Sequence, residues 1–511
     1  MIRKLVKTIR LLFKIIKLFF TEAYLTSTSV RAILRYLTGK LINLIILKYN
    51  ILQVRKRITQ VKDYKEWESY ARLLDHLEGN NEWKCRLESR SYDYARIERR
   101  RQMMKQLRKS DNVKTLTHCL RQDLVKNIGN MSCPALYSQC HFGTKKNVEK
   151  YMEEVTRCIK TIYQADQSKM SIEKKLQFFA ETRHSYGKTA LFLSGGASFG
   201  KWHFGTMRAL YEQDLFPRIV VGASVGSLIG SIICSRKYSD MPQFFDPHNV
   251  FNAPIIGKKT DSAVEFVWRL LREEPVLETQ TLKNYITRFT GDITFKEIFE
   301  SFGWNLNIVV TDHSEQQDAK LLNYLTSPNV VVWSAVLASC AIPKMFEEVH
   351  LMQKLQDGSI IPYDPSSSRM PYIDGSVGGD VPLHRVAELF NVNTFLVSQV
   401  NPQVIPFLSE DTGEVMSRRH KKRFLRAAQA CTNNTVNYLF KQLEALGIMP
   451  SFLVPLHSLM SQTYVGHVTL VPSPSISDYA SLLQNVDPNT AYVYQQELYV
   501  QSLRSKSYIS F

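Results

Sequence analysis

The chain of 511 residues lacks several common signatures. Its eight cysteines are scattered without a C-x-x-C pair, so neither a metal site nor a disulfide framework is expected. Several of them lie in apolar runs, which is typical of reduced, buried thiols in a chain that faces the cytosol. No zinc-finger, helix-turn-helix or RNA-recognition pattern appears, and this argues against nucleic acid as a partner.

Negative charge is also in short supply. Lysine and arginine number 65 against 47 acidic residues, which gives a net charge of +18. Such a surplus favours a polyanionic partner, and without nucleic-acid motifs we expect an anionic lipid surface. The dense basic run at 417–426 is expected to face that surface. A nuclear localisation signal or a merely solvated face would have the same composition.

No acidic residue occurs before Glu22. Apolar residues between Ile2 and Phe20 recur at helical spacing, while lysines and arginines occupy the other face. This pattern is typical of a helix that lies in a membrane interface, because the basic residues interrupt the apolar run too often for a spanning helix. A targeting peptide and an ordinary core helix are the alternatives. The apolar stretch 41–52 is also too short to span, and it either dips into a lipid monolayer or forms a buried helix.

Changes in the hydrophobic period divide the chain into four parts. Residues 1–58 form the membrane-associating region, and 59–186 are helical in pattern, with apolar residues at helical spacing from Trp67 onward. Residues 187–402 alternate short apolar strands with helices. This alternation predicts an α/β fold, with a parallel sheet covered by helices on both faces. Residues 403–511 are expected to form a C-terminal helical tail.

The α/β part contains two strand-to-helix turns in succession. The second turn is Gly222-Ala-Ser-Val-Gly226, which has the form G-x-S-x-G and would raise Ser224 on a tight elbow as a nucleophile. Gly222 and Gly226 would let the strand and the helix approach each other closely. A purely structural Gly/Ser turn is the alternative reading of this pattern.

The first turn runs from Gly195 to Gly200. We expect the backbone N–H groups of Gly196 and Ala197 to face the carbonyl oxygen of a substrate as an oxyanion hole, with Gly195 keeping the turn open. Lys201 follows directly and leaves a phosphate-binding loop as an alternative. The Gly-Lys-Ser/Thr ending of a P-loop and the spacing of a dinucleotide fingerprint are both absent.

A serine nucleophile also needs a group that takes its proton. His203 is the nearest histidine in sequence, but its apolar flank favours a packing role, and His384 is similarly undecided. Asp374 ends an apolar, strand-like stretch and precedes Gly375. Active sites of parallel sheets form at the carboxyl ends of strands, so Asp374 is a candidate, although an Asp-Gly turn is usually structural.

The glycine-rich turn, the elbow at Ser224 and the pair Asp374-Gly375, in this order, resemble the patatin-like phospholipase family. The resemblance implies a Ser–Asp dyad that works without histidine, with Ser224 as the nucleophile and Asp374 as the general base. The oxyanion loop would comprise Gly195, Gly196 and Ala197. Two positions depart from the family pattern: Ala197 stands where many members have a third glycine, and Lys201 where an apolar residue is expected.

Motifs within 67–84, 144–146, 322–336 and 390–402 extend the resemblance to the fungal and plant triacylglycerol lipases of this family, which carry a helical region ahead of the core. The resemblance implies hydrolysis of acyl esters in neutral lipid, most of all triacylglycerol, without a metal or organic cofactor. The amphipathic start and the basic runs would hold such an enzyme on a lipid droplet or the cytosolic face of the endoplasmic reticulum. Three alternatives stay open: a phospholipase, a lysophospholipid acyltransferase using the H-x4-D pattern at 313–318, and a non-enzymatic droplet protein. The oligomeric state is left open.

Overall fold

The computed structural model describes residues 28–405 and 465–509, except for positions 59, 62, 134, 259–264, 266–267, 270–271, 273, 313–318, 343–344, 348, 364–371, 375–382 and 403. The chain divides into two compact units, Met1–Trp83 and Lys84–Phe511, and each is considered by itself. The predicted interfacial helix, the basic run at 417–426 and the H-x4-D pattern lie outside the described residues.

The first unit contains α2 (Thr28–Ile58) and α3 (Tyr64–Leu77), and α4 (Asn80–Cys85) crosses its boundary. Helix α3 begins after Asp63, whose side chain accepts the backbone N–H of Glu66 at 2.9 Å and so caps the first turn. Its apolar face buries Trp67, Ala71 and Leu74, which confirms the predicted helical spacing.

The apolar stretch 41–52 forms part of α2 rather than a buried helix of its own. Leu41, Leu44, Ile46 and Leu52 are between 42% and 52% exposed, so the buried-helix alternative is wrong. Among the residues described, no helix is both long and apolar enough to cross a membrane. Among the described residues, helix α2 therefore presents a set of exposed large apolar side chains.

The second unit begins with helices at the predicted place: α5 (Tyr94–Lys109), α6 (Val113–Asp123), η2 (Ile128–Asn130), α7 (Ala135–Ser138), α8 (Lys146–Gln164) and α9 (Ile172–Tyr186). A buried ion pair joins α5 to α8, because Arg108 Nε donates to Glu154 Oε1 at 2.6 Å and Glu154 is almost fully buried. The Lys126 ammonium donates to Asn393 Oδ1 at 2.7 Å and so connects these helices to the sheet.

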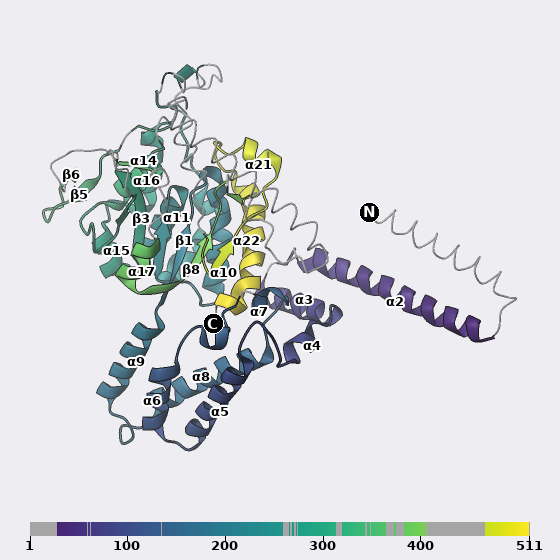
Figure 1. The fold of residues 1–511 in the computed structure, drawn as a ribbon. Helices are drawn as coiled ribbons and strands as arrows, with labels where there is room; N and C mark the ends of the chain where they lie inside the picture. Colours follow the sequence, from purple (N-terminus) through teal and green to yellow (C-terminus); the bar gives the residue numbers. More distant parts are fainter. Residues whose placement is uncertain are drawn as a thin grey trace, which may run out of the picture. The chain divides into compact units, whose positions relative to one another are not determined.

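A mixed sheet forms the centre of the second unit (Figure 1). Its strands are β1 (Lys188–Leu193), β2 (Ile219–Gly222), β3 (Asn305–Asp312), β4 (Ala319–Leu322), β7 (Tyr372–Asp374), β8 (Val392–Ser398) and β9 (Val468–Leu470). The order is β4-β3-β2-β1-β8-β9, and all neighbours from β3 to β9 are parallel. Strands β4 and β7 both run antiparallel to β3, while β5 (Met352–Lys354) and β6 (Ile360–Pro362) form a separate hairpin.

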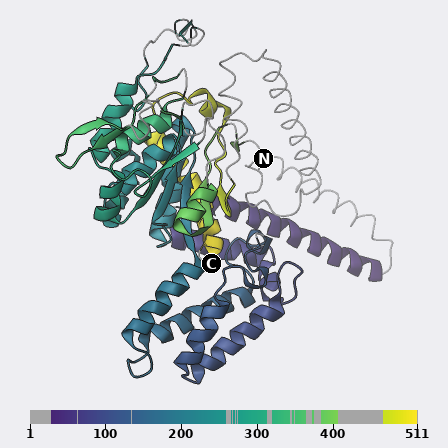
Figure 2. The ribbon, with the colours of Figure 1, turned by 60° about the vertical axis from the view of Figure 1, so that its left-hand side comes forward.

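Helices cover both faces of this sheet, as the alternation of strands and helices predicts (Figure 2). Leu191 and Leu193 of β1 join the larger core on one face, and Ala190 and Phe192 join the smaller core on the other. The larger core includes residues of α10 (His203–Glu212), α11 (Val225–Cys234), α14 (Thr279–Thr290), α16 (Val332–Cys340) and α22 (Pro488–Ile509). Helix α17 (Leu383–Phe390) packs into the smaller one. The shorter elements are η3 (Ala197–Trp202), η4 (Tyr238–Phe244), α12 (Pro247–Val250), α15 (Phe295–Phe302) and α21 (Ile476–Ala480).

The C-terminal segment contains the expected helix, α22, but it also contributes strand β9 to the sheet. Helix α22 packs against α10, and Tyr499 Oη donates to Glu212 Oε2 at 2.5 Å across the contact. The two backbones approach each other at Gly205, where a Cβ atom would lie 1.9 Å from the carbonyl oxygen of Gln495. The tail is thus an integral layer of the α/β fold.

This contact makes Gly205→Ala a destabilising change. The added methyl group would meet backbone atoms that cannot rotate away, so we expect a loss of about 1–3 kcal/mol in the free energy of unfolding. Gly230→Ala in α11 is the matched control, because its Cβ would lie at an ordinary 3.4 Å from Val220 Cγ1. Chemical denaturation of both variants measures the difference. Equal stabilities would contradict the close approach of α10 and α22.

Candidate active site

Ser224 lies at the turn between β2 and α11, where the backbone takes a sharp left-handed bend. Its φ is 51° and its ψ is −126°, an unusual conformation for a residue other than glycine. The Ser224 N–H donates to Ser339 Oγ at 2.9 Å, and Ser339 Oγ in turn donates to the Val309 carbonyl at 2.7 Å. The strained residue is therefore held from outside by α16 and β3, as a nucleophile elbow requires.

The two glycines of the G-x-S-x-G pattern are needed for close packing, as the sequence predicts. A Cβ atom on Gly222 would lie 2.6 Å from backbone atoms of the following turn. A Cβ atom on Gly226 would lie 2.0 Å from the carbonyl oxygen of Leu193 at the end of β1. The elbow therefore sits directly against the strand that leads into the other turn.

The glycine-rich turn follows β1 and passes beside Ser224. Gly196 has a φ of 147°, and a Cβ atom there would lie 2.4 Å from the Val400 carbonyl oxygen. Ala197 has a φ of 48°, so this position favours the glycine that many family members carry. In the part of the chain that the structure describes, no acceptor meets the backbone N–H groups of Gly196, Ala197 or Val225. These donors are available for an oxyanion, and Val225 is one that the sequence analysis did not name.

Asp374 is the last residue of β7 and is fully buried. Its backbone N–H donates to the Ala341 carbonyl at 3.0 Å. Strand β7 is antiparallel to β3, and it pairs Asp374 with Val310 near the carboxyl end of β3. The carboxylate therefore reaches the expected edge of the sheet, although its own strand runs in the opposite direction to the parallel ones.

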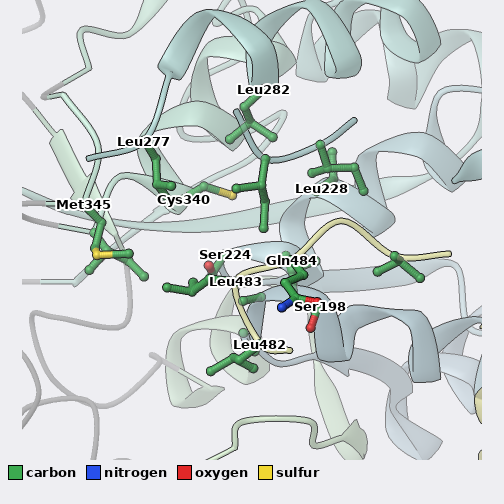
Figure 3. A pocket seen from close by; sticks show the side chains of 18 of the residues that line it. Ser198, Ser224, Leu228, Leu277, Leu282, Cys340, Met345, Leu482, Leu483 and Gln484 are labelled. Atoms are coloured by element: carbon green, nitrogen blue, oxygen red, sulfur yellow. The ribbon is translucent and has the colours of Figure 1, made fainter. Parts of the chain in front are cut away.

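All five residues assigned to the dyad and the oxyanion loop line one cavity of about 250 Å³. They are Gly195, Gly196, Ala197, Ser224 and Asp374. In Figure 3, Ser224 lies near the middle of this cavity, with Cys340 on one side and Leu482 on the other. Apolar side chains make up most of the remaining wall, which suits an acyl chain better than a polar substrate.

Several lining residues come from segments to which the sequence analysis gave no role. The loop at 482–486 forms one wall, and Asn485 joins it to the segment with Ile255 and Ile256, which follows α12. Asn485 Oδ1 accepts the N–H groups of Ile255 and Ile256 at 2.8 Å each, and its Nδ2 donates to the Ile256 carbonyl at 2.9 Å. Such contacts between distant segments leave no periodic signal in the sequence.

The buried Cys340 thiol also lies at this site. Burial raises the pKa of Cys340, and the charge of Asp374 adds to the shift, while hydrogen bonds with the hydroxyls of Ser224 and Ser227 oppose it. The thiol is therefore protonated at neutral pH and is no rival nucleophile to Ser224. Because Ser224 and Asp374 both act on this thiol, the two residues lie near Cys340 in the cavity wall.

The two candidate histidines do not serve as the base. His384 is exposed on α17 and does not line the cavity. His203 is fully buried, and its Nε2–H donates to the Ser194 carbonyl at 3.0 Å while its Nδ1 accepts from Ser398 Oγ at 2.8 Å. Burial lowers the pKa of His203 to about 4, against an opposing hydrogen bond to Ser194. His203 thus braces the chain just before the glycine-rich turn, in agreement with its predicted packing role.

Family comparisons match this architecture. Residues 191–387 match the model described as "Patatin-like phospholipase", and residues 45–184 match a domain of unknown function, DUF3336. The chain is 31% identical to triacylglycerol lipase ptl3 of Schizosaccharomyces pombe over 86% of its own length and 90% of that protein. It is 34% identical to triacylglycerol lipase SDP1L of Arabidopsis thaliana over 83% of its length and to triacylglycerol lipase 4 of Saccharomyces cerevisiae over 80%. It spans 52% and 46% of these two longer relatives.

Identity of this extent with a relative of nearly the same length places the chain in a family. The chain belongs to the patatin-like phospholipase family, and it carries the DUF3336 region ahead of the core. Within that family its relatives are proteins named as fungal and plant triacylglycerol lipases. Among solved structures, VipD from Legionella pneumophila gives a TM-score of 0.28 at 12% identity over 61% of this chain and 67% of that one, too loose a match to add to the comparison.

The low pKa of His203 predicts a pH dependence of stability. Between its ordinary value of 6.5 and about 4, the unfolded chain binds a proton that the folded chain does not, so stability falls as the pH falls. Lowering the pH from 7 to 5 should reduce the free energy of unfolding of the wild type by roughly 2 kcal/mol more than that of the His203→Gln protein. Urea denaturation at both pH values measures this difference. His384→Gln, which replaces an exposed histidine, is the control and should lose as much stability as the wild type between the two pH values. An equal loss in the His203→Gln protein would contradict the role given to His203.

Proposed function

We propose that this chain is a serine hydrolase of lipid esters, with triacylglycerol as its main substrate and a Ser224–Asp374 dyad as its catalytic machinery. The observation that carries this proposal is that Ser224, Asp374 and the oxyanion donors line the same apolar cavity. The names of the similar triacylglycerol lipases support the neutral-lipid substrate. The unusual backbone conformation of Ser224, which Ser339 holds in place, favours an enzyme over a non-enzymatic droplet protein, because such strain clusters at active sites.

In the first half of the reaction, the Ser224 hydroxyl attacks the ester carbonyl carbon and its proton passes to the Asp374 carboxylate. The carbonyl oxygen becomes an oxyanion, which the N–H groups of Gly196, Ala197 and Val225 stabilise. When this intermediate collapses, the bond to the glycerol oxygen breaks and the alcohol leaves with the proton from Asp374. An acyl group then remains on Ser224.

In the second half, water attacks the acyl-enzyme carbonyl and gives its proton to Asp374. Collapse of the second intermediate releases the fatty acid and returns the proton to Ser224 Oγ. A lysophospholipid hydroxyl in place of water would transfer the acyl group instead of hydrolysing it. Transfer by this route uses the same residues as hydrolysis and does not involve the H-x4-D pattern at 313–318. The acyl acceptor therefore separates the lipase from an acyltransferase that works through Ser224.

The proposed place of action is the surface of a lipid droplet or the cytosolic face of the endoplasmic reticulum. The basic amphipathic pattern of residues 1–20 and the basic run at 417–426 suit an anionic lipid surface. The exposed apolar side chains of α2 would add a shallow apolar contact. This location would bring the cavity to neutral lipid that cannot diffuse through water.

Ser224→Ala and Asp374→Asn should each lower hydrolysis of triolein emulsions by roughly 10³-fold or more, because one removes the nucleophile and the other the base. Ser224→Ala should also abolish labelling by a fluorophosphonate probe. Ser231→Ala in the same helix is the matched control, since Ser231 Oγ donates within α11 to the Leu228 carbonyl and does not line the cavity. Full activity of Ser224→Ala would reject the dyad.

The same preparation also decides the substrate class. Hydrolysis of triolein emulsions should exceed hydrolysis of phosphatidylcholine vesicles, and supplied lysophosphatidylcholine should not become the main acyl acceptor. Lipid-class-resolved product analysis of wild type beside Ser224→Ala measures each rate. The reverse order of rates would favour the phospholipase or acyltransferase alternative.

Membrane attachment is tested on α2 and on the N-terminal segment separately. Leu37→Gln, Leu41→Gln and Leu44→Gln together, and deletion of residues 1–20, should each shift protein from the floating to the soluble fraction with anionic phospholipid vesicles. Leu176→Gln on α9 is the control, because Leu176 is 66% exposed but lies outside the proposed surface. Unchanged flotation of both variants would reject this part of the proposal.

A further inference from the structure

Lys201 is a buried basic residue in the wall of the cavity that holds Ser224. It lies in η3, directly after the oxyanion turn, at a position where the family resemblance calls for an apolar residue. Its side chain is only 5% exposed, yet Lys201 lines the cavity together with Gly195 and Ser198. The catalytic scheme above gives no task to this ammonium group.

The surroundings of the ammonium are mainly aromatic. Lys201 Nζ lies 3.7 Å from the centroid of the Tyr494 ring and 4.9 Å from that of the Trp202 ring. Asp478 is the acidic side chain whose charge acts on it, but that carboxylate already accepts the N–H of Ser475 at 2.6 Å and the hydroxyl of Tyr494. Within the described residues no carboxylate lies at ion-pair distance from Lys201 Nζ.

Burying such a cation costs free energy, and its surroundings offset only part of that cost. Burial lowers the pKa of Lys201 because the charged form loses its hydration, and the charge of Asp478 opposes this shift. The ring faces offset part of the desolvation cost, but they supply no counter-charge. An anionic oxygen that entered the cavity would complete the environment of the ammonium.

The rest of the cavity limits what can carry that anion. Leu228, Phe251, Ile255 and Leu482 contribute apolar wall, so a small hydrated anion would be poorly accommodated. An acyl chain would cover this wall while its head group met Lys201. A ligand that combines an apolar chain with an anionic head would therefore fit this wall and Lys201 together.

We propose that Lys201 forms an anion subsite in the wall of the acyl cavity, where it binds the carboxylate or phosphate head of a single-chain lipid. The apolar half of the argument rests on the proposed lipid-hydrolase function, since it takes the cavity as an acyl-chain site. The subsite gives the cavity a preference for charged over neutral single-chain lipids. Bound in this way, a charged lipid would compete with neutral substrate for the same wall.

The test measures binding rather than turnover, in the full-length Ser224→Ala protein. Oleate and 1-oleoyl lysophosphatidate, each below its critical micelle concentration, and neutral oleyl alcohol, below its solubility limit, displace a neutral pyrene-labelled alcohol from the cavity. At least one of the two anions should bind about tenfold more tightly than oleyl alcohol, as a charge-assisted contact predicts. The anion that shows this gain identifies the head group as carboxylate or phosphate.

Adding Lys201→Met should reduce the ratio of anion to alcohol affinity by about tenfold, and Lys201→Arg should retain it. Lys283→Met is the matched control, because Lys283 Nζ also lies over a tryptophan ring, 4.4 Å from the centroid of Trp333, but does not line the cavity. A partly unfolded variant would bind both ligands less, so the ratio of their affinities is insensitive to a general loss of folding. The arginine variant controls for the effect of changing the residue while keeping its charge.

Two outcomes would overturn the subsite. Equal affinities for anions and alcohol would mean that Asp478 and the two rings already balance the ammonium. An unchanged ratio in the Lys201→Met protein would mean that another group selects the anion. The result is independent of the proposed reaction. If the wild type hydrolyses no lipid ester but shows the Lys201-dependent ratio, the proposed function is wrong and the subsite stands. If the enzyme is active but shows no such ratio, the function stands and the subsite is wrong.

Discussion

The carbonyl oxygen of Leu193 is the point on which the candidate site depends. It accepts the N–H of Ala223 at 3.2 Å, and it lies where a Cβ atom on Gly226 would be 2.0 Å away. One backbone atom at the end of β1 therefore fixes the distance between the glycine-rich turn and the elbow. Since an oxyanion hole works only when its donors are placed before the charge develops, this contact turns two ordinary turns into one site.

A layer of polar contacts beneath the two turns keeps that arrangement rigid. His203 joins the Ser194 carbonyl to Ser398, and Ser194 Oγ accepts the N–H of Val400 at 2.7 Å. The end of β1, the start of α10 and the end of β8 are thus held by a neutral, fully buried imidazole. A histidine near a serine nucleophile is commonly taken as its base, but here the same residue type serves as scaffold, because burial disfavours its charged form.

The cavity itself is a product of distant segments. Its wall comes from four places in the chain: the segment with Ile255 and Ile256 after α12, the first part of α14, the end of α16 and the loop at 482–486. Asn485 connects two of these segments, and α22 packs the C-terminal segment against α10. Access to Ser224 and the shape of the cavity are therefore set by parts of the chain outside the two turns, so they can vary while the two turns stay the same.

Local chemistry in the sequence determined the alternation of strands and helices, the elbow at Ser224 and the glycine-rich turn, because each depends on neighbouring residues and on the small size of glycine. The sequence also made Asp374 a candidate through its place at the end of a strand-like stretch, and the family resemblance gave it the role of general base. Tertiary structure alone decided that β7 runs antiparallel, that β9 and α22 return to the sheet, and that α2 exposes its apolar residues. It alone placed Val225, Cys340 and Lys201 at the cavity. These features join residues far apart in the chain, and such long-range contacts leave no period or motif from which they could be read.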